Sequence, residues 1–169
     1  ETYWLQDNTG ISKSGCLGYW KFQEQSGVLT NHATTTNGFT DGLGSAADGT
    51  VDAGIDRTAT GKFRVYAYEF DNTNAEKVSI SDQNGLDITG DITITAWIYP
   101  SQGGSGGRFL VGKRTSANAN YQFYGRETSG GADDLYLAYY DNTNSSKTTT
   151  TTELTRNAWH FVAMTISSN

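Results

Sequence analysis

The residues best suited to bind a ligand are aromatic side chains in two segments of alternating composition. In ITITAWIY every second residue is apolar and small or aliphatic, so Trp97 and Tyr99 fall on the opposite face of an extended chain. In LYLAYY, Tyr136 and Tyr140 share one face. Aromatic rings stack on the apolar C–H faces of sugars, which makes these four side chains our candidate ligand-binding residues. Packing in the core or beneath loops is the competing interpretation.

Asp71 and Asn72 carry the hard oxygen atoms that Ca²⁺ prefers, and they follow an aromatic strand pattern. A calcium ion needs about six to eight oxygen ligands, so two adjacent residues would supply a minority of them. An Asx turn, in which the side chain binds nearby backbone, explains the same pair without a metal. The pair is therefore either a turn or part of a calcium site, and calcium is the one cofactor that we consider.

Catalytic arrangements are poorly represented, and we expect a non-catalytic protein. Glu69 and Asp71 lie two residues apart on an extended chain, which places their Cα atoms roughly 6.5 Å apart. That spacing is compatible with glycoside hydrolysis, but it is only a fragment of a carboxylate motif. The histidines, His32 in a polar loop and His160 in a strand pattern, and the single Cys16 do not suggest a nucleophilic triad. We expect Cys16 to be a small buried residue.

Composition limits the class of protein and its partners. The chain has 169 residues, of which 36% are hydrophobic and 12% aromatic, and it is rich in Gly, Thr, Ser and Asn, which are poor helix formers. The net charge is −6, so phosphate backbones and anionic lipids would repel the chain. No apolar run approaches the roughly 20 residues of a membrane helix. These features predict an all-β protein without nucleic-acid binding or membrane insertion.

The elements that position the candidate residues are short strands joined by polar turns. Residues 1–15 read as an N-terminal arm, and the stretch Gln23–Gly61 is expected to hold one or two short strands among ordered loops. The expected strands are Cys16–Phe22, Lys62–Phe70, Lys77–Ile80, Ile92–Tyr99, Arg108–Lys113, Tyr121–Arg126, Leu135–Tyr140, Ser146–Thr152 and Trp159–Ile166.

Five segments in a fixed order give the chain a family resemblance. LGYWKFQEQSG, GKFRVYAYEFDNTNAEKVSI, LDITGDITITAWIYP, GGRFLVGKR and NAWHFVAMTI together resemble laminin G-like domains of the concanavalin A-like lectin/glucanase superfamily. The resemblance implies a jelly-roll sandwich of two antiparallel sheets over residues 16–169, with calcium as the usual ion at its rim. The chain departs from the family pattern at Asn72, where glycine is common, and in an unusual insert at Gln23–Gly61. A third departure is the lack of a counterpart for the strands that normally follow NAWHFVAMTI.

The resemblance implies a recognition or adhesion module that binds carbohydrate or a cell-surface ligand outside the cell or on a virion or filament. A structural alternative stays open, in which the domain is a building block that assembles with neighbouring subunits. A neighbouring chain would then supply the missing strands and cover an exposed edge. Glycoside hydrolysis is the weakest of the three hypotheses.

Overall fold

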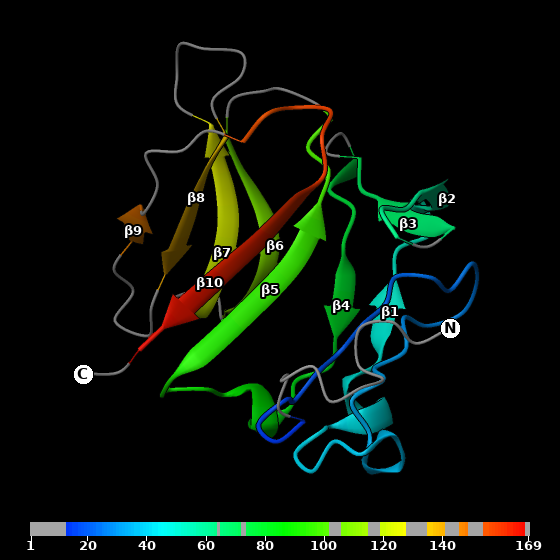
Figure 1. The fold of residues 1–169 in the computed structure, drawn as a ribbon, viewed down its shortest axis with the longest axis vertical. Coiled ribbons are helices and arrows are strands. Elements are labelled where there is room, and N and C mark those ends of the chain that lie inside the picture. Colours follow the sequence, from blue (N-terminus) through cyan, green and yellow to red (C-terminus); the bar gives the residue numbers. More distant parts are fainter. Residues whose placement is uncertain are drawn as a thin grey trace. The chain divides into compact units, whose positions relative to one another are not determined.

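A computed structural model describes residues 13–63, 65–71, 74–101, 106–114, 119–127, 135–140, 146–148 and 154–167. In this part of the chain the secondary structure consists of antiparallel strands with a few 3₁₀ turns, as Figure 1 shows, which confirms the all-β prediction. None of the described helices is long and apolar enough to cross a membrane. The chain divides into two compact units, residues 1–86 and residues 87–169.

The first unit is built from short strands in antiparallel pairs. β1 pairs with β4, and β2 pairs with β3. Two of these strands, β1 and β2, lie within the stretch expected to hold one or two, so that prediction is confirmed. The bounds are β1 Gly49–Val51, β2 Asp56–Thr60, β3 Tyr66–Glu69 and β4 Val78–Ile80, with 3₁₀ helices η1 Thr35–Asn37, η2 Gly44–Ala47 and η4 Asn84–Leu86.

The prediction of a strand over Cys16–Phe22 is wrong. This segment contains an isolated bridge between Trp20 and Asn31 instead of a continuous ladder. The Tyr19 carbonyl accepts a hydrogen bond from the His32 amide at 2.8 Å, but the Tyr19 amide donates to the Asn31 side chain, also at 2.8 Å. A side chain therefore takes the place of a partner strand, because an extended segment becomes a strand only where backbone pairs with backbone.

A core cluster of Leu29, Ile55 and Tyr68 holds the first unit together. The Tyr68 hydroxyl donates to the Glu24 carbonyl at 2.6 Å, so its polar end is satisfied. The predicted strand Lys62–Phe70 is shorter than expected, since β3 begins only at Tyr66. Partly buried side chains that pack against the cluster are Trp20, Phe22, Val51 and Val78.

The described part of the second unit contains two antiparallel sheets. One is the pair β10-β5, and the other has the order β6-β7-β8-β9. The expected strands of this region are confirmed to within two residues at their described ends. The bounds are β5 Ile92–Ile98, β6 Gly106–Arg114, β7 Ala119–Glu127, β8 Leu135–Tyr140, β9 Ser146–Thr148 and β10 His160–Ile166.

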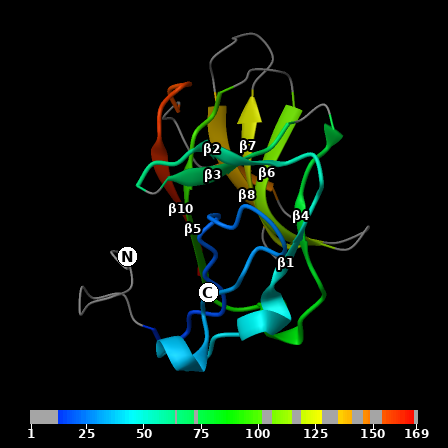
Figure 2. The same ribbon diagram turned by 90° about the vertical axis from the view of Figure 1, so that its right-hand side faces the viewer.

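The two sheets of the second unit pack face to face. Phe123 of β7 lies in one buried cluster with Val162 and Met164 of β10. Figures 1 and 2 show β5 and β10 as one layer beside β6, β7 and β8. This contact confirms the predicted sandwich of two antiparallel sheets within the second unit. Further side chains that pack against the cluster are Ile94, Ala96, Ile98, Leu110, Leu154 and Ile166.

Candidate ligand-binding site

The pairing of β5 with β10 separates a buried face from an exposed face. Along β5, partly buried residues alternate with exposed ones from Ile92 to Ile98. The register places Trp97 directly opposite Phe161 and Thr93 opposite Thr165. Residues that face each other across an antiparallel pair project to the same side, so the two strands present one shared outer surface.

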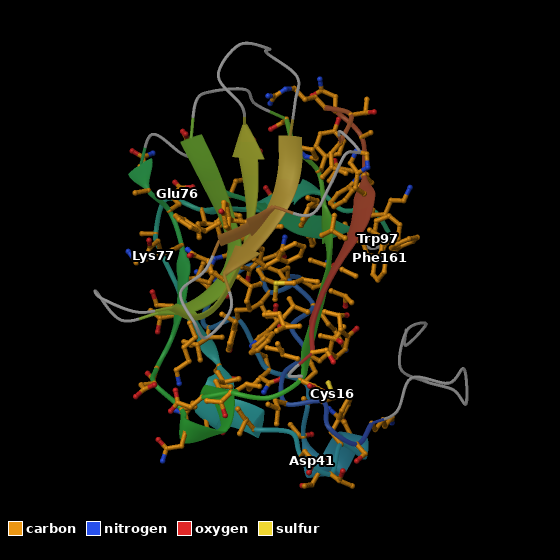
Figure 3. The ribbon with its side chains drawn as sticks, turned by 90° about the vertical axis from the view of Figure 1, so that its left-hand side faces the viewer. Cys16, Asp41, Glu76, Lys77, Trp97 and Phe161 are labelled. Carbon is orange, nitrogen blue, oxygen red and sulfur yellow. The ribbon has the colours of Figure 1, made fainter. Side chains whose placement is uncertain are left out.

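Four aromatic side chains gather at one end of this surface, which we call the aromatic face: Trp97, Tyr99, Trp159 and Phe161. The ring centroids of Trp97 and Phe161 are 5.5 Å apart, and those of Tyr99 and Trp159 are also 5.5 Å apart. Figure 3 shows the Trp97 and Phe161 side chains together on the outside of β10. Trp97 is 36% exposed, Tyr99 45% and Phe161 54%. A contiguous exposed apolar surface of this kind usually marks an interaction site.

The alternating sequence predicts that Trp97 and Tyr99 lie on the face opposite the aliphatic residues, and the alternation of β5 confirms that placement. In the described part of the structure neither ring is buried in a core cluster, since Trp97 and Tyr99 are 36% and 45% exposed. Sequence reasoning missed Trp159 and Phe161 as their partners. Both occur at alternate positions of the predicted last strand, but its register against β5 could not be obtained from the sequence.

The second candidate pair lies in the other sheet. Tyr136 and Tyr140 are on β8, opposite Arg126 and Gln122 of β7 in the strand register. Their side chains lie outside the described part of the structure. The predicted aromatic pairs thus belong to different sheets of the second unit, and ligand binding by Tyr136 and Tyr140 stays a prediction.

The candidate calcium pair is described only in part, because Asn72 lies outside the described residues. Asp71 follows β3, and its backbone amide donates to the Glu76 carboxylate at 2.6 Å. Among the described residues, no group of three or more His, Cys, Asp or Glu side chains could hold a metal ion. Asp71 and Glu76 alone supply too few oxygen ligands for calcium, so these residues do not by themselves form a site.

The histidines and the cysteine considered for catalysis have structural partners. His160 donates from Nε2 to the Thr155 carbonyl at 2.7 Å, and His32 lies 3.4 Å from the Glu24 carboxylate. Cys16 is half-buried and not part of either core cluster, which corrects the expectation of a buried residue. Burial raises the pKa of its thiol above the ordinary value, against a smaller opposing effect of its hydrogen bond to Gly18. A raised pKa leaves less of the reactive thiolate.

A comparison with protein families decides the identity of the fold. A laminin G-type model of the concanavalin A-like lectin/glucanase superfamily matches residues 71–169, which include β4 to β10. The chain belongs to this superfamily. No curated protein and no solved structure matches it significantly.

Membership of the superfamily gives the described geometry its functional setting. These laminin G-like domains are generally non-catalytic ligand-binding modules, although the superfamily also includes glycosidases. The matched region carries the whole aromatic face and both sheets of the sandwich. The laminin G-like domain is thus a carbohydrate- or ligand-binding module in the broad sense.

Proposed function

We propose that this laminin G-like domain is a non-catalytic recognition or adhesion module that binds carbohydrate through its aromatic face. The observation that carries the proposal is the presence of four aromatic rings in two contacting pairs on one outer sheet surface. Three of the rings are at least one-third exposed, which leaves area for a ligand. Sugar rings present apolar C–H faces to aromatic side chains, while their hydroxyls hydrogen-bond to neighbouring polar groups.

A glycan array followed by titration of the best ligand tests this proposal. We expect Trp97→Ala and Phe161→Ala each to weaken binding at least tenfold, about 1.4 kcal/mol. Phe109→Ala is the matched control, because Phe109 is an exposed aromatic residue of β6, outside the aromatic face. Thermal unfolding of each variant checks that the fold persists. Binding to no glycan, or equal losses in all three variants, would contradict the proposal.

A structural role in a filament or virion is the second candidate. Among the described strands, β10 pairs with β5 alone, so its other edge presents backbone groups that an added strand could pair with. Sedimentation of the native protein tests this role. Assembly into a defined oligomer that survives loss of the aromatic face would favour it over carbohydrate recognition.

Extracellular display and calcium binding complete the proposed setting. Calcium would be held by Asp71 and Asn72 together with further oxygen ligands. Metal analysis of the purified protein and of Asp71→Ala measures this, with loss of bound calcium expected in the variant. Unchanged calcium content would reject this site and leave the carbohydrate proposal in place, because Asp71 is not part of the aromatic face.

A further inference from the structure

The outer surface of β5 and β10 changes character along the strands. Cross-strand pairs follow each other in the order Thr93–Thr165, Thr95–Ala163 and Trp97–Phe161, and the Tyr99–Trp159 ring contact comes next. A strand rises about 3.4 Å per residue, so the distance from Thr93 to Tyr99 is roughly 20 Å. The surface therefore has a hydroxyl-bearing end and an aromatic end, and it is long enough for several sugar units in a row.

The hydroxyl-bearing end can bind polar groups of a ligand. The Thr93 and Thr165 hydroxyl oxygens are 3.2 Å apart and hydrogen-bond to each other. Each hydroxyl has one hydrogen and two acceptor positions, so one hydrogen bond between them leaves a donor and several acceptors for other partners. Both threonines are exposed, which keeps these groups accessible.

Between Thr93 and Tyr99 the surface has no charged side chain to match a charged ligand, and the exposed carboxylate two residues before Thr93, Asp91, would itself repel an anionic one. The eight described residues of this surface include no Lys, Arg, His, Asp or Glu: they are Thr93, Thr95, Trp97, Tyr99, Trp159, Phe161, Ala163 and Thr165. The chain as a whole carries a net charge of −6, which repels anionic ligands. A neutral glycan is therefore the best match, and an acidic or sulfated polysaccharide is a poor one.

The ring orientations favour a single chain over a flat polymer surface. The planes of Trp97 and Phe161 are inclined by 51°, and those of Tyr99 and Trp159 by 57°. A crystalline polysaccharide would need coplanar rings across the whole platform. Tilted rings can instead contact successive units of a twisted chain, each at its own angle.

We propose that this surface binds one extended chain of a neutral β-linked glycan, aligned with β5 and β10. Sugar units lie against the aromatic face, and the following units donate and accept hydrogen bonds at Thr93 and Thr165. A β-linked chain with equatorial hydroxyls is extended and exposes apolar C–H groups on both ring faces, which suits a straight surface of rings and hydroxyls. The inference rests on the proposed function and specifies its ligand.

Calorimetric titration with cello-oligosaccharides from the disaccharide to the hexasaccharide tests the inference. Malto-oligosaccharides provide the α-linked control and oligogalacturonates the anionic control. We expect affinity to rise at least tenfold with length among the cello-oligosaccharides. The double variant Thr93→Val/Thr165→Val should lower hexasaccharide affinity by severalfold more than disaccharide affinity. Phe109→Ala should change neither.

The outcomes separate this inference from the proposed function. Binding of glycans without length dependence, or tighter binding of the α-linked or anionic series, would overturn the extended-chain inference while carbohydrate recognition stands. Equal loss at every length in the threonine variant would overturn the role of Thr93 and Thr165. Binding to no glycan on the array or in the titrations would overturn both proposals.

Discussion

Asn31 shows how one buried polar residue organises the first unit. Its side chain is 1% exposed, and Oδ1 accepts hydrogen bonds from the amides of Tyr19 at 2.8 Å and Ala33 at 3.0 Å. Its Nδ2 donates to the Leu17 carbonyl at 3.3 Å. These bonds hold the segment that replaces the expected first strand.

Removing this side chain should destabilise the fold strongly. Asn31→Ala leaves two amides without their partner, and a buried unsatisfied donor costs about 1–3 kcal/mol, so we expect a loss of about 3 kcal/mol in the free energy of unfolding. Asn37→Ala is the matched control, because Asn37 is exposed and its side chain makes one bond, to the His32 carbonyl. Urea denaturation measures both. Similar losses in the two variants would contradict the role given to Asn31.

We expect Asp41 to make the stability of the first unit depend on pH. Its carboxylate accepts hydrogen bonds from the Gly15 amide at 2.6 Å, the Thr40 hydroxyl at 2.9 Å and the Ser14 hydroxyl at 3.4 Å. The Gly15 bond contributes most, and together these bonds lower the pKa of Asp41 below its ordinary value of 3.8. Because the folded pKa is depressed, the stabilisation is complete above the ordinary pKa and is lost as pH falls through the lowered one.

Asp41→Asn isolates this charge, since the amide oxygen can still accept hydrogen bonds. We expect the variant to unfold at a lower temperature than the wild type at pH 7. The difference should shrink as pH falls below about 3.8 and vanish once Asp41 is protonated in the folded state. Thermal unfolding followed by circular dichroism between pH 2 and pH 7 measures it. A difference that is independent of pH would show that the charge is not the cause.

At the scale of the element, β10 serves the core and the outer surface at once. Val162 and Met164 are buried, with 3% and 4% of their surface exposed. Phe161, the residue before Val162, is 54% exposed on the other face of the strand. Met164→Ala should lower the free energy of unfolding by about 3 kcal/mol, because it removes buried volume from between the two sheets. Thr95→Val, on the exposed face of the paired strand, should change it by less than about 0.5 kcal/mol. Chemical denaturation of both variants tests this division, which equal effects would contradict.

Strands with strong apolar alternation could be predicted from the sequence, and strands without it could not. β5 and β8 lie where ITITAWIY and LYLAYY place them. β2, with the sequence DRTAT, carries no apolar pattern and was not located. Cys16–Phe22 has a strand-like sequence, but the Asn31 side chain occupies a position that a partner strand would need. That contact joins Tyr19 to Asn31, which lies outside the segment, so the pattern of Cys16–Phe22 alone does not reveal it.

The candidate site could be predicted only as far as one strand determines it. Period-two alternation assigns Trp97 and Tyr99 to one face of β5 without knowledge of any neighbour. Phe161 joins them because the register pairs it with Trp97, and a shift by one residue would turn it toward the core. The sequence of β10 is compatible with either register, and packing between the two sheets selects the register in which Phe161 is exposed.

At the scale of the whole molecule, net charge opposes self-association through the aromatic face. The chain carries a net charge of −6 at pH 7 and has a calculated isoelectric point near 4.7. Two copies therefore repel each other at neutral pH, and this repulsion weakens as pH approaches the isoelectric point or as salt screens the charges. An exposed aromatic surface of this kind is then a part of the molecule that can form contacts between copies.

Self-association should therefore rise as pH is lowered from 7 toward 4.7, and the aromatic face should carry it. We expect Trp97→Ser/Phe161→Ser to reduce the associated fraction at pH 5 by at least half, as measured by sedimentation velocity. Phe63→Ser/Phe109→Ser is the matched control, because it removes two aromatic side chains that are 56% and 63% exposed but lie outside the face. The pH range stays above the ordinary Asp41 pKa of 3.8, so protonation of that carboxylate does not contribute to the change in association. Equal reductions by the two double variants would indicate that exposed aromatic residues in general, and not this surface, drive association.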